Sequence, residues 1–214
     1  MIVDERLVTY INSLDTGNTS ILDQIEQEAL DSYVPIIRKE MQQFLKLLLA
    51  MKRPMRILEV GTAVGFSAIL MAEYDPVPCE ITTIENYEKR IPIAKENFIR
   101  AGKEEQITLI EGDAMDVLKT LEGSFDFIFM DAAKGQYIHF MPDILRLLGP
   151  EGTLVSDNVL QDGDIIESRF AVTRRNRTNH KRKREYLYEL THDEHLVTAV
   201  LPIGDGVTVS TWKK

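Results

Sequence analysis

The sequence is poor in cysteine, because Cys79 is the single one among 214 residues. A lone cysteine excludes an intramolecular disulfide and a metal site built only from cysteines. Long apolar runs are also missing: FLKLLLAM falls far short of the roughly 20 residues that span a bilayer. The N-terminus lacks the basic and then apolar segments of a secretory signal. These absences predict a cytoplasmic protein with no membrane partner.

Positive charge is scarce overall but concentrated in one place. The chain has 25 Lys and Arg against 34 Asp and Glu, for a net charge of −9. This balance argues against a general polyanion binder, so we expect no DNA partner, and any nucleic-acid contact must be local. Residues 174–184, RRNRTNHKRKR, nevertheless hold seven Lys or Arg, one His and no acid. Without those seven residues the net charge would be −16.

Length and composition predict one folded domain that spans residues 1–214. The chain is 44% hydrophobic and 28% charged, as is ordinary for a globular protein, and it shows no repeat, low-complexity linker or domain boundary. We expect helices over about residues 1–52. The last of these is predicted to begin at Pro35, because apolar residues follow at helical spacing. They are Ile37, Met41, Phe44, Leu45 and Leu48.

Short apolar runs then alternate with helical segments. The runs are RILEVG, EITTIE, ITLIEGDA, FDFIFMDA and GTLVSDN. This alternation predicts an α/β fold, a doubly wound and mostly parallel seven-stranded sheet of Rossmann-like type with helices on both faces. The final stretch, HLVTAVLPIGDGVTVSTWKK, holds two strands around a turn rich in Pro and Gly. It predicts a C-terminal antiparallel hairpin.

Polar residues or glycine close each apolar run. The carboxyl ends of parallel strands meet at one edge of a sheet, where ligands bind. Any single acid at such a place is about as often the N-cap of the next helix. Five consecutive strands that end in this way favour a binding site. The residues concerned are Glu59, Gly61, Glu85, Asp113, Asp131, Asp157 and Asn158.

The first strand-end turn, EVGTAVGFS, distinguishes between cofactors. Thr62 and Ala63 follow Gly61, so the second glycine of the dinucleotide pattern G-x-G-x-x-G is missing. This disfavours a nicotinamide or flavin oxidoreductase. The pattern E-x-G-x-x-x-G instead resembles the first motif of the class I S-adenosylmethionine-dependent methyltransferases.

That resemblance implies a cofactor site along the strand ends. Gly61 and Gly65 would let the backbone approach the methionine part of the cofactor, and Ser67 would help to hold its carboxylate. Glu85 would accept both ribose hydroxyls, and the turn at Asp113 would flank the adenine. The implied cofactor contacts are Glu59, Gly61, Gly65, Ser67, Glu85, Asp113, Ala114 and Asp131.

Three oxygen-bearing side chains follow neighbouring strands. Asp131, Asp157 and Asn158 offer hard ligands that suit Mg²⁺, with water and substrate oxygens completing the shell, and that do not suit Zn²⁺. The alternative is that Asp157 and Asn158 only form a turn. The sequence therefore predicts a magnesium site beside the cofactor.

The residues from Pro35 through Asn158, and again LPIGDGVTV, resemble the metal-dependent O-methyltransferases of the catechol and caffeoyl-coenzyme A type. The resemblance implies that the metal takes two vicinal substrate oxygens, that Lys134 is the catalytic base or positions the hydroxyl beside Asp131, and that Ile37 contacts the cofactor. It also implies a homodimer, with residues 21–35 as a candidate interface. Ala133 departs from the plant enzymes, which have a second acid there.

The basic run lies in a segment of about residues 160–190 where this type of fold places substrate-facing insertions. Its location and charge favour binding to the tRNA backbone, with His180 adding a hydrogen bond. The chain also resembles the bacterial methyltransferases that convert 5-hydroxyuridine to 5-methoxyuridine at the wobble position of the tRNA anticodon. Their substrate presents a hydroxyl next to a carbonyl, like a catechol. The predicted tRNA-binding residues are Arg174, Arg175, Arg177, Lys181, Arg182, Lys183 and Arg184.

Two other functions fit part of the sequence. An enzyme of the same chemistry could methylate a small catechol or phenylpropanoid, in which case the basic run is a solvated surface. A non-catalytic tRNA-binding protein is a weaker alternative, because such a protein needs neither the metal ligands nor Lys134.

Overall fold

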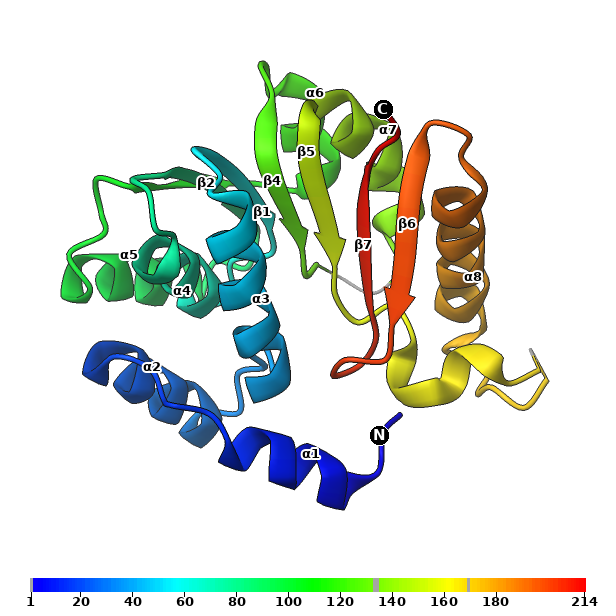
Figure 1. The fold of residues 1–214 in the computed structure, drawn as a ribbon, viewed down its shortest axis with the longest axis horizontal. Coiled ribbons are helices and arrows are strands. Elements are labelled where there is room, and N and C mark those ends of the chain that lie inside the picture. Colours follow the sequence, from blue (N-terminus) through cyan, green and yellow to red (C-terminus); the bar gives the residue numbers. More distant parts are fainter. Residues whose placement is uncertain (1, 133–134, 169) are drawn as a thin grey trace.

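The computed structural model describes residues 2–132, 135–168 and 170–214. Its strands alternate with helices in the order that the sequence predicts (Figure 1). The strands are β1 (Arg56–Val60), β2 (Glu80–Glu85), β3 (Ile107–Glu111), β4 (Phe125–Met130), β5 (Leu148–Ser156), β6 (Leu196–Leu201) and β7 (Val207–Trp212). The helices are α1 (Glu5–Ser13), α2 (Ser20–Asp31), α3 (Lys39–Lys52), α4 (Phe66–Tyr74), α5 (Ile91–Arg100), α6 (Ala114–Thr120), α7 (Tyr137–Leu147), the 3₁₀ helix η1 (Gln161–Ile166) and α8 (Arg177–His192).

The seven strands form one sheet in the order β3-β2-β1-β4-β5-β7-β6. Strands β1 to β5 are parallel, whereas β7 runs antiparallel to both β5 and β6. The predicted fold class and C-terminal hairpin are therefore confirmed. The chain moves outward from β1 to β3 and then returns to place β4 on the other side of β1. This reversal opens a crevice at the carboxyl ends of β1 and β4, the place where open α/β sheets bind ligands.

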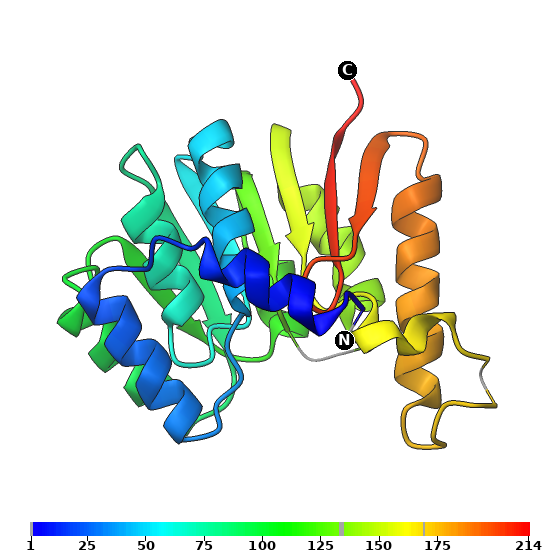
Figure 2. The ribbon, with the colours of Figure 1, turned by 60° about the horizontal axis from the view of Figure 1, so that its bottom comes forward.

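Both faces of the sheet are buried, as the continuous apolar runs indicate. Successive residues of a strand point to opposite faces, so Ile57 belongs to one hydrophobic cluster and Leu58 to the other. The first cluster also contains residues of α2, α3, α4 and α5, and the second contains residues of α6, α7 and α8. Helix α1 lies beyond the carboxyl ends of β4 and β5 in both ribbon views (Figures 1 and 2).

The third helix begins later than its apolar spacing predicts. Helix α3 starts at Lys39, with Arg38 extended at its N-cap, so Pro35 and Ile37 lie outside the helix. The side chain of Ile37 is buried in the first cluster, which explains why it matches the spacing of a helical face. Its carbonyl oxygen accepts a hydrogen bond of 3.1 Å from the side chain of Gln42. The helix does not extend back to Pro35.

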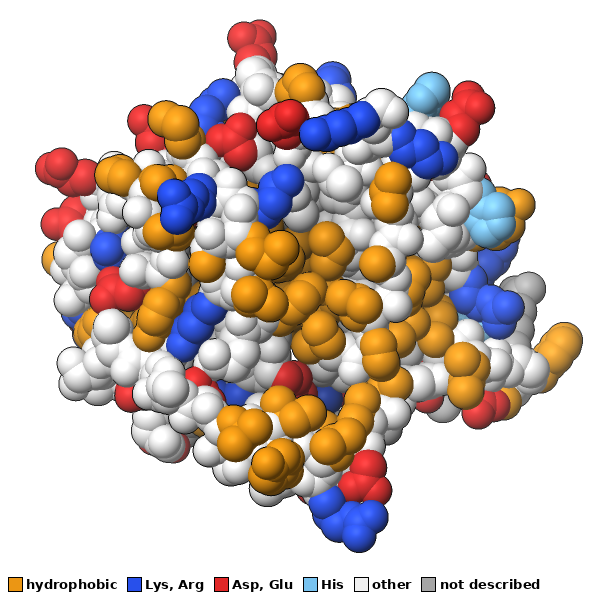
Figure 3. Space-filling model, in the orientation of Figure 1, with side chains coloured by type: hydrophobic (Ala, Val, Ile, Leu, Met, Phe, Trp, Pro, Cys, Tyr) orange, Lys and Arg blue, Asp and Glu red, His pale blue; other side chains and the backbone are white. Residues whose placement is uncertain are grey.

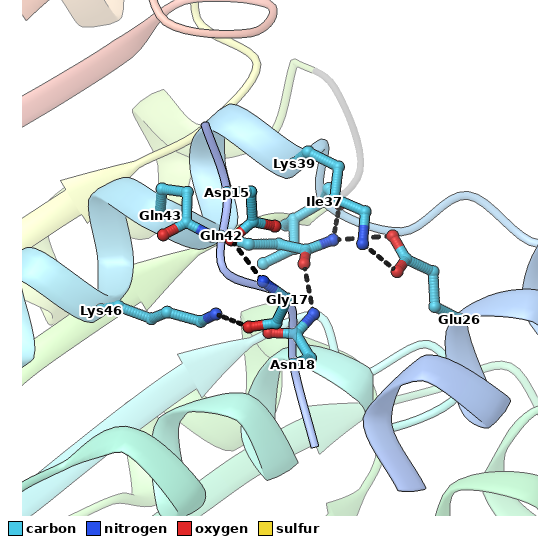
Figure 4. A network of polar contacts seen from close by, with 9 residues as sticks. All are labelled: Asp15, Gly17, Asn18, Glu26, Ile37, Lys39, Gln42, Gln43 and Lys46. Atoms are coloured by element: carbon cyan, nitrogen blue, oxygen red, sulfur yellow. Dashed lines mark hydrogen bonds and ion pairs between the residues drawn. The ribbon is translucent and has the colours of Figure 1, made fainter. Parts of the chain in front are cut away.

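Gln42 is the centre of a polar network that fixes this segment (Figure 4). Its side chain is fully buried, donates to Glu26 at 3.0 Å and accepts from Asn18 at 2.9 Å. Glu26 is also paired with Lys39 at 2.6 Å. Buried polar groups are costly unless hydrogen-bonded, so these contacts hold α2 and the start of α3 in a defined relation.

The segment expected to be a substrate-side insertion contains η1 and α8. Helix α8 contacts α7 and β6, so it is one of the helices that cover the sheet. It contributes Tyr186 and Leu190 to the second hydrophobic cluster. The basic run therefore occupies the loop before α8 and the first half of a packed helix.

Exposed hydrophobic side chains gather over α3, β7 and β6 on the face shown in Figure 3. Exposed residues of these elements include Leu47, Met51 and Val197. In α2, by contrast, Leu22, Ile25 and Ala29 are buried in the protein core, whereas Leu30 is exposed. The homodimer and the role of residues 21–35 in it stay predictions. Among the described residues, no helix is long and apolar enough to cross a membrane.

Candidate functional site

A cavity of about 750 Å³ opens at the carboxyl ends of β1, β2 and β4. Most of the residues that the sequence singled out for cofactor and metal meet in its wall. Those that line it are Ile37, Gly61, Ser67, Glu85, Asp113, Ala114, Asp131, Asp157 and Asn158. Glu59 and Gly65 are described residues that do not line it. Lys134 and Ala133 lie outside the described residues, so the catalytic role of Lys134 stays a prediction.

Gly61 is required by the protein backbone itself. Its φ of +106° is in the region that favours glycine, and a Cβ there would lie 2.2 Å from the carbonyl oxygen of Asp131. The end of β1 thus passes too close to the end of β4 to carry any side chain. The close approach that the structure shows at Gly61 is to Asp131, and the expected contact of Gly61 with the cofactor stays a prediction.

Gly65 shapes the start of α4, and its expected cofactor contact stays a prediction. It is the N-cap of α4 with a φ of +85°, and an added Cβ would lie 2.5 Å from the ring of Phe98. The two glycines of the motif therefore shape two ends of one turn. Gly61 lets β1 and β4 meet, and Gly65 lets α4 start against α5.

Glu59 lies inside the protein, beneath the cavity. It is fully buried and accepts hydrogen bonds from the hydroxyls of Ser67 and Thr83. Burial raises its pKa to about 7, although the two hydroxyls oppose the shift. Glu59 does not line the cavity, and its expected cofactor contact stays a prediction. Glu59 fixes Ser67, whose hydroxyl points to Glu59 while the residue still lines the cavity.

The Glu85 carboxylate fixes the backbone that follows β1 and the backbone that follows β2. One carboxylate oxygen accepts from the backbone N–H of Ala63 at 2.8 Å, and the other accepts from Asn86 and Tyr87 at 3.0 and 2.8 Å. The carboxylate is therefore held at the cavity wall, with about one of its four lone-pair sites left for a ligand. Asp113 has two functions, because it caps α6 by accepting from Met115 at 2.8 Å and it also lines the cavity.

The oxygen-bearing residues predicted to hold a metal are brought together. The amide of Asn158 donates to Asp131 at 2.8 Å, and its backbone N–H donates to Asp157 at 2.7 Å. Asn158 has a φ of +60°, which is uncommon for a residue other than glycine. The chain bends at Asn158 directly after β5, and this bend places the side chains of Asp157 and Asn158 beside Asp131.

The charges of this cluster suit a divalent cation. Asp157 is 5% exposed, and burial followed by the nearby Asp131 raises its pKa to about 8. Two adjacent carboxylates with little water are stabilised in their ionised form by a cation. No group of three His, Cys, Asp or Glu suited to a metal exists among the described residues. A metal here therefore needs the amide oxygen of Asn158, and this all-oxygen set fits Mg²⁺ better than Zn²⁺.

Tyr137 was not found by sequence reasoning. Its buried hydroxyl donates to the carbonyl oxygen of Met130 or Asp157, at 3.2 and 3.1 Å, and accepts from the N–H of Ala132 at 3.2 Å. It therefore joins the ends of β4 and β5 beneath the acidic cluster. Nothing in an amphipathic helical pattern distinguishes this tyrosine from one that only packs.

Arg38 and Asp205 were also missed. Both line the cavity and form an ion pair, and Arg38 contacts Asp162 at 3.1 Å as well. The pair connects the segment before α3 to the turn between β6 and β7. Asp205 lies within LPIGDGVTV, a stretch that the family resemblance had already marked.

The basic run divides into exposed and buried residues. Arg174, Arg175, Lys181 and Arg184 are exposed. Arg177 and Arg182 are half-buried and donate to backbone carbonyls of Val172 and Gly135, at 3.2 and 3.5 Å.

Lys183 and His180 correct the prediction for this run. Lys183 is 1% exposed, and its ammonium donates a hydrogen bond to the carbonyl oxygen of Asn158. From this position it cannot reach a tRNA phosphate. His180 is buried as well, which removes its expected hydrogen bond to RNA. Both residues lie on the side of α8 that packs against the protein.

The sheet order, the turn at Gly61 and the cavity define a Rossmann-like methyltransferase fold. The O-methyltransferase family model matches residues 12–213, so the chain belongs to that family. More closely, it belongs with the O-methyltransferases of the catechol and caffeoyl-CoA type.

Three comparisons describe the likeness. The catechol O-methyltransferase of Niastella koreensis is 37% identical over 129 residues, which is 58% of each chain. The caffeoyl-CoA O-methyltransferase of Medicago sativa is 30% identical over 181 residues, which is 78% of this chain and 70% of that protein. The SAH-bound methyltransferase PaMTH1 of Podospora anserina superposes with a TM-score of 0.88 at 29% identity, covering 98% and 95% of the two chains.

Replacing Gly61 should test the β1–β4 contact. Gly102→Ala is a matched control, since Gly102 also has a positive φ of +63° but no heavy atom near the added Cβ. The control should lower the free energy of unfolding by about 1–2 kcal/mol through strain alone. Gly61→Ala should cost about 3 kcal/mol or more and weaken S-adenosylhomocysteine binding, because the backbone at Asp131 must move. Urea unfolding and calorimetry measure both, and equal costs for the two variants would contradict the account.

Glu59 should make stability fall with rising pH. Its pKa in the folded protein, about 7, is above the ordinary value of 4.5. The unfolded chain therefore loses its proton first, and the free energy of unfolding decreases between about pH 4.5 and 7. Glu59→Gln cannot ionise, so its loss of stability from pH 5 to pH 8 should be smaller by about 2–3 kcal/mol. Urea unfolding at both pH values measures the difference, and parallel pH profiles would show that Glu59 ionises normally.

Proposed function

We propose that this protein transfers the methyl group of S-adenosylmethionine to one of two adjacent oxygens of a catechol or phenylpropanoid, with a divalent cation at Asp131, Asp157 and Asn158. One observation carries the proposal. Asp131 belongs both to the wall of the cofactor cavity and to the cluster of oxygen ligands. A methyl donor and a pair of chelating oxygens would therefore meet at one residue.

The protein's own residues would bind and orient the cofactor. Glu85 presents a carboxylate already fixed by three backbone N–H groups, which suits the two hydroxyls of a ribose. The turn after β1 would receive the methionine part near Ser67, and the turn at Asp113 would flank the adenine. Because the cofactor's methyl group is activated by its own positive charge, positioning is the main contribution required of the protein, and it can be worth about 7–11 kcal/mol.

The acidic cluster would hold the acceptor. A bound Mg²⁺ would supply charge that lowers the pKa of a coordinated hydroxyl. Asp131 and Asp157 would fix that cation in a wall that leaves little water, and Tyr137 keeps the strand ends beneath it in register. Lys134 stays the predicted base for the hydroxyl proton, and no covalent intermediate with the protein is needed.

A tRNA bearing 5-hydroxyuridine is the second candidate substrate, and the exposed cations of the basic run support it. Arg174, Arg175, Lys181 and Arg184 reach solvent from the loop before α8 and from its first turns. Such a cluster on an acidic protein suits a local phosphate contact. The relatives reported above favour the small-molecule class, since they are named for catechol and caffeoyl-CoA. Both candidates use the same vicinal-oxygen chemistry.

The direct test is a competition between the two substrate classes. Purified protein is incubated with S-adenosylmethionine, Mg²⁺, caffeoyl-CoA or catechol, and tRNA that carries 5-hydroxyuridine, and the products are identified by mass spectrometry. Methylation of any of these substrates should be lost by at least about tenfold in EDTA and restored by added Mg²⁺. Methylation that is indifferent to EDTA would contradict the metal part of the proposal.

Surface charge then distinguishes the substrates. Changing Arg174, Arg175, Lys181 and Arg184 together to Ala should lower tRNA methylation and flatten its salt dependence, while leaving a catechol unaffected. The matched control changes four exposed cations elsewhere, Arg6, Lys52, Lys119 and Lys213, to Ala for the same loss of charge. Turnover of the small molecule alone would remove tRNA as the substrate.

A further inference from the structure

Lys183 is a buried cation next to the C-terminal end of the basic run. It is 1% exposed, while Lys181 and Arg184 on the same helix are exposed. Burying an ammonium costs free energy unless it is hydrogen-bonded, so this side chain needs a compensating partner inside the protein. Its ammonium donates to the backbone carbonyl oxygen of Asn158.

The residue that it contacts has an uncommon backbone conformation. Asn158 adopts a φ of +60°, in the left-handed region, which asparagine tolerates better than most residues other than glycine. Its backbone N–H is held by Asp157 and its side chain by Asp131. Lys183 fixes the remaining polar group, the carbonyl. The three contacts together set the orientation in which the Asn158 side chain reaches the acidic cluster.

We propose that Lys183 is a positioning residue for the cation site, which it orders by holding the carbonyl of Asn158 from α8. The inference rests on the proposed function, because it presumes that Asp131, Asp157 and Asn158 bind a divalent cation. It also explains why a lysine within the basic run faces the protein. Groups that orient metal ligands typically change affinity by 10–100-fold when they are removed.

Simple electrostatics predicts the opposite effect. Lys183 carries a positive charge close to the cation site, so removing it relieves repulsion and should tighten cation binding. Loss of positioning should weaken binding. The direction of the change therefore separates the two effects, and we expect positioning to prevail because the ammonium contacts a ligand residue directly.

The experiment measures Mn²⁺ binding by the decrease of the free-ion electron paramagnetic resonance signal, with S-adenosylhomocysteine present. Lys183→Met keeps most of the length of the unbranched side chain and removes its ammonium group. Tyr186→Phe is the matched control on the same buried side of α8, since the Tyr186 hydroxyl contacts Ser156 at 2.6 Å and no predicted ligand. Lys119→Met, at an exposed position of α6, controls for the loss of one positive charge.

We expect Lys183→Met to weaken Mn²⁺ binding by at least about tenfold. Both control variants should stay within about twofold of wild type, and S-adenosylhomocysteine affinity should be unchanged in all of them. Methyl transfer by Lys183→Met should recover at high metal concentration. Unchanged or tighter Mn²⁺ binding by a folded Lys183→Met protein would overturn the inference. Absence of Mn²⁺ binding by wild type would overturn the proposed metal site itself.

A measurement on the wild-type protein covers the case in which Lys183→Met does not fold. A buried, hydrogen-bonded ammonium exchanges its protons slowly and gives its own nitrogen–proton signal in nuclear magnetic resonance. Titration with Mg²⁺ should shift this signal in step with saturation of the site. A Lys183 signal that stays constant through saturation would contradict coupling between the lysine and the cation site.

Discussion

The contact between the ends of β1 and β4 is the constraint on which the rest of this structure depends. The sheet reverses direction between these strands, and Gly61 allows the backbone of Asp131 to come within a distance that no side chain could permit. The turn after β1 and the acidic cluster after β4 and β5 thereby share one wall. A protein with the same strands but a bulkier residue at position 61 would separate the two halves of the site. The proposed chemistry needs both halves, because methyl donor and acceptor must be in line.

Buried polar residues then fix the parts of that wall. Glu59 holds Ser67 from below, Tyr137 joins the ends of β4 and β5, and Lys183 holds Asn158 from α8. Each would be costly to bury without its partner. Ionisable groups therefore lie behind the cavity wall as well as in it. The two sides of α8 also have different roles. One side of the helix supports the acidic cluster, while the other carries the exposed cations that support the tRNA hypothesis.

Much of the fold was predictable because strand and helix periodicities differ and because polar residues closed each apolar run. The hairpin, the sheet and the meeting of Glu85, Asp131 and Asp157 followed from those patterns. What escaped prediction depends on individual hydrogen bonds. Helix α3 starts at Lys39 after an extended Arg38, and the Gln42 side chain bonds to the carbonyl of Ile37, neither of which spacing alone can show. Lys183 was read as a surface cation, since a pattern of residue types does not reveal that one backbone carbonyl satisfies a buried ammonium.

The central claim is that one cavity holds the methyl donor and a cation at Asp131. A crystal structure grown with S-adenosylhomocysteine and Mn²⁺, with anomalous scattering recorded for manganese, tests it most directly. The account predicts the ribose at Glu85, the amino-acid part near Gly61, and one manganese peak contacted by Asp131, Asp157 and Asn158. A ligand bound elsewhere, or a cavity that holds the ligand while manganese is absent from the acidic cluster, would contradict it.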